Sequence, residues 1–240
     1  MMGLTLSRRA RWGLIGIFLF ALVAFFPMRL AFGLLGVDRY GISAHDIRGS
    51  VWMGRISQLI LGEVPLGTVR AGLSPIQLFV LRARLDVARS KGLPDDIKGA
   101  LSAGPGRYGI DDVTGALPLG AATAPLPIAA VDMQDVTAHF AQGRCAGAEG
   151  QVRAKIAGDV PGLNLSQGLS GAARCEGDAL VLPMVSQSGL EKLTVRLSGN
   201  GRYLAEMRIS TSDPALAQTL GAAGFTQGDG DSVLRIEGTM

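Results

Sequence analysis

The side chains that could carry acid–base or nucleophilic chemistry are few and scattered. The chain has two histidines, His45 and His139, and no Gly-x-Ser-x-Gly sequence of the kind that presents the nucleophile of many hydrolases. His45 precedes Asp46, but neighbouring residues of a strand point to opposite faces of a sheet. We therefore expect both histidines to face solvent, and we predict no catalytic residues.

A glycine-rich segment and two acidic pairs are the remaining candidates for a bound group. Residues 104–109 match Gly-x-Gly-x-x-Gly, but a dinucleotide site needs a strand before these glycines and a helix after them. Asp111 and Asp112 follow instead, and their charges would repel a phosphate. These two residues and the Asp229–Asp231 segment offer too few oxygens for a calcium loop. We interpret both acidic segments as turns, and we interpret residues 99–109 and 121–127 as loops. We predict no bound cofactor and no metal.

The two cysteines, Cys145 and Cys175, lie in similar surroundings, Arg-Cys-Ala-Gly and Arg-Cys-Glu-Gly. An even number of cysteines in an exported domain indicates a disulfide. Closing a loop of about thirty residues would stabilise the fold by roughly 3.5 kcal/mol. A redox pair or a metal site is the alternative, but no Cys-x-x-Cys is present and only the two histidines could join as ligands. We predict a structural disulfide.

The net charge of +3 is concentrated at the N-terminus. The first 37 residues contain Arg8, Arg9, Arg11 and Arg29 and no acidic residue, so the rest of the chain is close to neutral. A near-neutral domain has no general attraction to polyanions. We therefore predict no nucleic-acid partner.

An apolar run of 24 residues, 12–35, follows three of these arginines and is long enough to cross a bilayer core. The arginines place the N-terminus in the cytoplasm by the positive-inside rule. A cleaved signal peptide is the alternative, but the residues before Ala24 lack the small-x-small cleavage pattern and the apolar run continues beyond it. We therefore predict a cytoplasmic tail over 1–11, a single transmembrane helix over 12–35 and an outer domain over 36–240.

The outer domain has the two-residue periodicity of β-strands. Residues 192–198 alternate apolar with polar side chains, Asn200 and Gly201 suit a tight turn, and residues 202–209 form the return strand. The same alternation recurs at 69–73, 81–87 and 152–156. Turns between short strands account for much of the high glycine count of 34.

This pattern predicts a mainly β fold, an antiparallel and strongly twisted sheet or roll with one covered face. A sandwich and an open half-pipe fit the alternation equally well. Short helices are expected at 74–79 and 212–220, where a proline follows a capping residue. The segment Gly49-Ser50-Val51-Trp52-Met53-Gly54 is interpreted as a first hairpin. We expect its turn at Gly49–Ser50 and expect Trp52 to cover the apolar face of the sheet.

The order of these features along the chain resembles that in the N subunit of the type II secretion system. The resemblance rests on the arginine-flanked apolar run, the 49–54 segment with Val51 and Trp52, Ser74–Pro75 leading to 81–85, the cysteine pair, the hairpin 199–203 with Tyr203, and Gly224–Phe225 followed by 233–238. It implies an inner-membrane anchor and a periplasmic β-rich domain. It also implies a non-catalytic role in the export of folded proteins across the outer membrane, in contact with the inner-membrane platform or the outer-membrane pore.

Two other functions stay open at this point. The succession of strands is also similar to that of lipid-transfer proteins with an inner-membrane anchor and an apolar β groove. An exported enzyme is the third class, although no catalytic motif supports it. The sequence also leaves homo-oligomerisation open.

Overall fold

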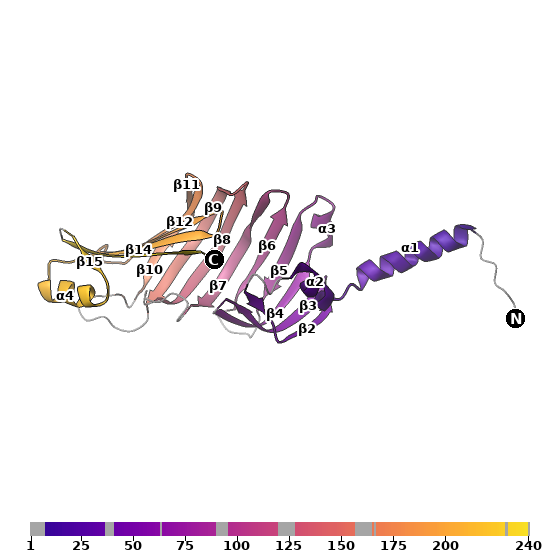
Figure 1. Ribbon diagram of the computed structural model, residues 1–240, viewed down its shortest axis with the longest axis horizontal. Helices are drawn as coiled ribbons and strands as arrows, with labels where there is room; N and C mark the ends of the chain where they lie inside the picture. Colours follow the sequence, from indigo (N-terminus) through magenta and orange to yellow (C-terminus); the bar gives the residue numbers. More distant parts are fainter. Residues whose placement is uncertain are drawn as a thin grey trace.

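The computed structural model describes residues 8–36, 41–62, 64–89, 96–119, 128–156, 165, 167–228 and 230–239. Within them, sixteen strands form one antiparallel sheet, in which strands that follow one another along the chain mostly lie side by side (Figure 1). The predicted mainly β, antiparallel fold is therefore confirmed, as a single sheet. The expected loop at 121–127 and Asp229 lie outside the described residues.

The strands are β1 (Ile42–Ser43), β2 (Asp46–Ser50), β3 (Met53–Leu61), β4 (Val64–Leu73), β5 (Ala83–Ala88), β6 (Lys98–Gly104), β7 (Arg107–Pro118), β8 (Ile128–Ala141), β9 (Arg144–Ile156), β10 (Leu169–Ala172), β11 (Arg174–Glu176), β12 (Ala179–Val185), β13 (Glu191–Ser198), β14 (Arg202–Ser210), β15 (Thr226–Gln227) and β16 (Asp231–Thr239). The helices are α1 (Arg8–Ala24), α2 (Met28–Leu35), α3 (Pro75–Leu78) and α4 (Pro214–Ala222). Both short helices predicted from the sequence, α3 and α4, are present.

The expected continuous helix over 12–35 is interrupted. α1 ends at Ala24 and α2 begins at Met28, with Pro27 in an extended conformation between them. Proline cannot donate the helical hydrogen bond, and it disfavours helical dihedrals in the residue before it. The break therefore follows from Pro27.

None of the helices among the described residues combines the length and the apolar character that crossing a bilayer requires.

The hairpin of β13 and β14 forms where it was predicted, with a longer turn. The loop has three residues, Gly199 to Gly201, and the Gly201 N–H donates to the Ser198 carbonyl over 3.0 Å. Gly201 has a φ of +82°, while the Asn200 side chain accepts from the Arg202 N–H over 3.1 Å. This is a three-residue hairpin loop with a left-handed glycine at its end, instead of a two-residue turn.

The interpretation of 99–109 as a loop was wrong. Most of this segment belongs to β6 and β7, and only Pro105–Gly106 form the turn between them. Gly109 lies where a side chain would overlap the Ala138 carbonyl of β8. Glycine in this region therefore permits close approach of neighbouring strands, a second use of glycine besides turns.

The main core lies on one face of the C-terminal half of the sheet. It contains the fully buried Leu169, Leu193 and Met207, and α4 packs onto it through Leu216 and Leu220. The Asp213 carboxylate caps α4 by accepting the Ala215 N–H over 2.9 Å. The expected covered face is thus confirmed for this half.

The predicted disulfide is present between Cys145 at the start of β9 and Cys175 in β11. The Cys145 N–H also donates to the Asp178 carbonyl over 2.9 Å. The bridge therefore holds the short strand β11 against β9, next to a small cluster of buried side chains that includes Phe140 and Leu180.

Candidate functional site

The segment 49–54 joins the N-terminal helices to the sheet. Its turn consists of Val51 and Trp52, because Ser50 pairs with Met53 and Gly49 with Gly54. The expected turn at Gly49–Ser50 was therefore displaced by two residues. Trp52 does not cover the apolar face of the sheet: its indole N–H donates to the Val23 carbonyl near the end of α1 over 2.9 Å.

Backbone hydrogen bonds continue this joint on both sides of the turn. The Val51 N–H donates to the Phe26 carbonyl over 2.9 Å, and the Val51 carbonyl accepts from the Leu73 N–H over 2.8 Å. Pro27 forms an isolated bridge with Ser50. The segment between α1 and α2 is therefore held on the first hairpin, beside the last residue of β4.

Glycines make this close contact sterically feasible. A side chain on Gly54 would overlap the sulfur of Met28, and one on Gly72 would overlap the Trp52 carbonyl. Gly49 has a φ of +92°, which favours glycine. Met28 is almost fully buried and packs with Ile56, Val69 and Ala71. The glycines of the motif thus allow α2 to lie against the first strands.

A row of basic side chains crosses the same strands on the other face. Arg48 of β2 lies directly opposite Arg55 of β3, and Arg55 lies opposite Arg70 of β4. The row continues through Ala88 to Lys98 of β6. We call Arg48, Arg55, Arg70 and Lys98 the basic row. Like charges directly opposite each other destabilise a sheet, so folding alone does not explain it.

Most of the basic row lacks a counter-ion within the described residues. Arg48 pairs with Asp46 over 2.6 Å, whereas Arg55, Arg70 and Lys98 form no ion pair there. All four side chains are exposed. Three unpaired cations are therefore available to an anionic group outside this part of the chain.

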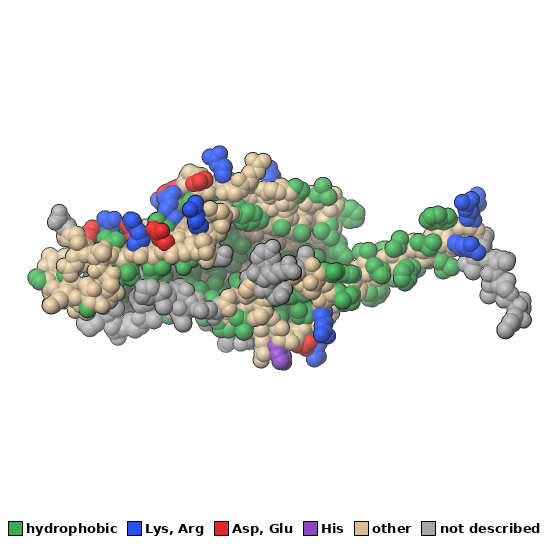
Figure 2. Space-filling model, viewed as in Figure 1, with side chains coloured by type: hydrophobic (Ala, Val, Ile, Leu, Met, Phe, Trp, Pro, Cys, Tyr) green, Lys and Arg blue, Asp and Glu red, His purple; other side chains and the backbone are tan. Residues whose placement is uncertain are grey.

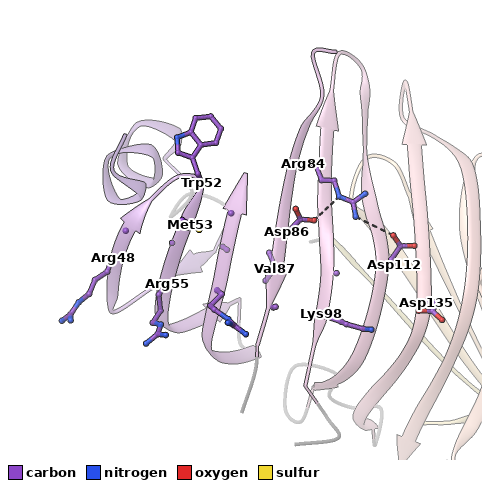
Figure 3. A pocket seen from close by; sticks show the side chains of 17 residues that line it. Arg48, Trp52, Met53, Arg55, Arg84, Asp86, Val87, Lys98, Asp112 and Asp135 are labelled. Carbon is purple, nitrogen blue, oxygen red and sulfur yellow. Dashed lines mark hydrogen bonds and ion pairs between the residues drawn. The ribbon is translucent and has the colours of Figure 1, made fainter. Parts of the chain in front are cut away.

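The basic row borders a cleft of about 880 Å³, shown in Figure 3. Acidic side chains also line it: Asp86 of β5, Asp112 of β7 and Asp135 of β8, with Lys98 on β6 between the first two strands. Asp112 and Asp135 have φ angles of +52° and +49° and lie at shifts in strand register. β-Bulges often re-aim a side chain in this way. The earlier interpretation of Asp111–Asp112 as a turn is corrected: both belong to β7.

Arg84 of β5 also lines the cleft. Its Nε donates to Asp86 over 3.1 Å, and its Nη2 lies 3.7 Å from an Asp112 oxygen (Figure 3). The hydrogen bond to Asp86 raises the pKa of Arg84 above its ordinary value. Arg84 is thus engaged with acidic residues, in contrast to Arg55 and Arg70.

His139 is partly exposed to solvent, with 37 % of its side chain accessible, and its Nε2 lies 2.7 Å from the buried Asp111 carboxylate. Arg82 lies 3.4 Å from the same carboxylate. Burial raises the pKa of Asp111, but hydrogen bonds from His139 and Ser102 and the charges of His139 and Arg82 outweigh it and lower the pKa below its ordinary value. The cluster therefore stabilises a buried carboxylate in its charged form.

A histidine held by a carboxylate is the arrangement that orients a general base. Completing a nucleophilic site requires a hydroxyl or thiol at the other ring nitrogen, and the part of the chain that is described places none there. His45, the other histidine, is exposed as expected, while its neighbour Asp46 pairs with Arg48. Nor do three His, Cys, Asp or Glu residues gather for a metal among the described residues.

Comparison with known proteins places this arrangement in a family. The model of the family "Type II secretion system (T2SS), protein N" matches residues 40–235, which include the whole of the basic row and the disulfide. No curated protein and no solved structure matches the chain significantly. Because the family model covers well over half of the sequence, the chain belongs to the type II secretion system protein N family.

Proposed function

We propose that this protein is a non-catalytic accessory subunit that acts by holding other secretion subunits in place. The family match, which makes it a component of the type II secretion system, carries this proposal. The sheet offers extended surfaces and a charged cleft, which suit a contact role better than turnover of a substrate. Its partners are other subunits of the same machine, in the inner-membrane platform or at the outer-membrane pore.

The same proposal places the N-terminus in the cytoplasm, α1 in the inner membrane and the sheet in the periplasm. In its support, no residue of α1 is buried, and its exposed side chains include Trp12, Phe18 and Phe20. At the N-terminal end of this helix, Arg8, Arg9 and Arg11 are exposed. Figure 2 shows hydrophobic side chains along the rest of it. The disulfide also suits an oxidising compartment such as the periplasm.

The basic row is the surface we propose for contact with a secretion subunit. Its unpaired cations favour an acidic partner surface, because complementary charge gives specificity and speeds association. An acidic partner surface would offset the cost of placing Arg55 opposite Arg70. The proposal therefore predicts that this face matters for function more than for folding.

Export of secreted enzymes from the periplasm tests this function. Deleting the gene should impair export while growth stays nearly normal, and the wild-type gene should restore export. The Arg55→Glu/Arg70→Glu variant should fold but restore export poorly. The matched control is Lys192→Glu, a charge reversal at an exposed lysine of β13 outside the cleft. Unaffected export in the deletion strain would count against the proposal as a whole.

A lipid-handling protein with an apolar groove is the second candidate. One row of apolar side chains crosses β12, β13, β14 and β16 and consists of Leu182, Val195, Ala205 and Ile236. All but Ala205 are only partly buried. α4 covers the adjacent row, so that part of the face is closed. Lipid extracted from the protein after purification in mild detergent, and identified by mass spectrometry, would support this candidate. Protein free of lipid would argue against it.

A further inference from the structure

The loop that contains α3 exposes an unusual amount of apolar surface. Ile76, Phe79, Val80 and Leu81 are 77 %, 89 %, 70 % and 76 % exposed, and Leu78 is 39 % exposed. Single exposed apolar residues are common, but five within six positions form a patch. Residues 74–81 contain no charged residue. We call residues 76–81 the apolar loop.

Hydrogen bonds connect the strand that leads into the apolar loop to the end of α1. The Phe26 carbonyl, two residues after α1, accepts from Val51, and the Val51 carbonyl accepts from Leu73. α3 begins two residues after Leu73. Since hydrogen-bonded strands lie about 4.8 Å apart, Leu73 lies roughly 10 Å from Phe26, three residues before the loop starts at Ile76. Figure 1 accordingly shows α3 on the side of the sheet from which α1 emerges.

Other apolar side chains extend this surface. Phe25, the residue after α1, is 79 % exposed, and Met53, next to Trp52, is 82 % exposed. Figure 2 shows hydrophobic side chains on the edge of the body nearest α1 as well as along α1 itself. The apolar surface of α1 therefore continues onto the sheet at the joint.

We propose that the apolar loop inserts into the bilayer interface beside α1 and forms a second membrane contact. This inference rests on the proposed anchoring of α1. The bilayer is the occupant that the geometry favours, because the joint ties the loop to the end of the segment proposed to lie in the membrane. Apolar side chains enter the boundary between headgroups and acyl chains to a depth of about 5–10 Å, and a basic residue such as Arg82, which follows the loop, suits the anionic headgroups at that boundary.

A second contact has a mechanical consequence. Trp52 and Val51 hold the sheet to the end of α1, so a sheet anchored by α1 alone would tilt together with that helix in the bilayer. Insertion of the apolar loop gives the sheet a fixed face toward the membrane and so fixes the direction of the basic row. The loop therefore orients the surface that we propose for partner binding.

Labelling of single introduced cysteines tests this inference on the full chain. Among the described residues there is no free cysteine, so Phe79→Cys creates a unique site for an environment-sensitive fluorophore. Leu190→Cys is the matched control, because Leu190 is also exposed but precedes β13 in the C-terminal half. Phe18→Cys in α1 reports the anchor itself. Each labelled protein is reconstituted into nanodiscs containing lipids and no other protein.

The expected result is a shift of the Phe79 label to shorter emission wavelengths, with loss of quenching by aqueous iodide and gain of quenching by a lipid-bound quencher. The Leu190 label should stay open to iodide. If the Phe18 label enters the lipid but the Phe79 label behaves like the Leu190 label, the inference is wrong and the anchoring stands. If the Phe18 label stays in water, the proposed anchoring itself fails. A Phe79 label shielded in cells but open to iodide in nanodiscs would indicate a protein partner and would also overturn the inference.

Discussion

Adding one methyl group at Gly54 should loosen the joint between α2 and the first hairpin. A Cβ at this position would overlap the sulfur of Met28, which is almost fully buried. Either the methyl group is forced into a filled space, which typically costs about 1–3 kcal/mol, or Met28 leaves its site. Loss of Met28 burial costs a similar amount, about 1.5–3 kcal/mol. Both routes predict that Gly54→Ala lowers the free energy of unfolding by about 1–3 kcal/mol.

Urea denaturation followed by tryptophan fluorescence measures this change, with Trp52 reporting from the joint itself. Gly147→Ala is the matched control, because no atom lies within 4 Å of the added methyl group in β9. There the loss of glycine entropy in the unfolded chain should leave stability unchanged or raise it by about 0.4–1 kcal/mol.

A double-mutant cycle identifies the cause. Met28→Ala alone should cost about 2–5 kcal/mol, but it also makes room for the methyl group at residue 54. Gly54→Ala should therefore cost much less in the Met28→Ala background, with a coupling of about 1 kcal/mol or more. Additive effects of the two substitutions would refute the steric reasoning and show that the two residues are not in contact.

Four further outcomes are expected. Trp52→Phe removes the hydrogen bond to Val23 and should lower the urea midpoint by the equivalent of about 0.5–1.5 kcal/mol; no change would mean that water replaces it. Replacing both Cys145 and Cys175 with serine should cost about 3.5 kcal/mol in the same measurement, and an unchanged midpoint would contradict a structural role. Because the pKa of Asp111 is lowered in the folded state, its contribution to stability is present at neutral pH and is lost as the pH falls below the ordinary aspartate range of about 4. Asp111→Asn should therefore make the urea midpoint less dependent on pH between 5 and about 2.5. A pH profile identical to that of the wild type would refute this. Arg70→Gln should leave stability unchanged or raise it by about 0.2–1 kcal/mol, because it relieves the repulsion with Arg55; a clear loss of stability would show that the basic row supports the fold.

Alternation in the sequence was sufficient to predict strands where one face is buried against a core. Leu193 and Met207 are fully buried while their neighbours Lys192 and Arg208 are exposed, so the two-residue period of β13 and β14 was clear apart from Leu204. The same reasoning failed at 99–109. Glycine there serves close packing of strands, which composition does not distinguish from turns.

The N-terminal prediction failed in part for a local reason. Hydropathy over 12–35 is continuous, but Pro27 divides the segment into α1 and α2. The position of the first turn was also wrong, because the backbone of Val51 pairs with Phe26 and Leu73, which are distant in sequence. Long-range pairing of this kind leaves no signal in local composition.

The segment 49–54 was recognised from the sequence, but the basic row and the Asp111–His139 contact were not. Arg48, Arg55 and Arg70 are ordinary polar positions of separate strands, and only the strand register brings them into one row. The contact between His139 and Asp111 likewise depends on the pairing of β7 with β8. The disulfide was predictable, because an even pair of cysteines has few other uses in an exported chain.

Site-specific photo-crosslinking in cells tests the central claim most directly. A photoreactive residue placed at Arg55 should form covalent adducts with another type II secretion subunit, identified by mass spectrometry, while the same residue at Lys192 should not. Crosslinks at Arg55 that never contain a secretion subunit, or equal adducts at both positions, would contradict the proposal that the basic row holds this protein in the secretion machine.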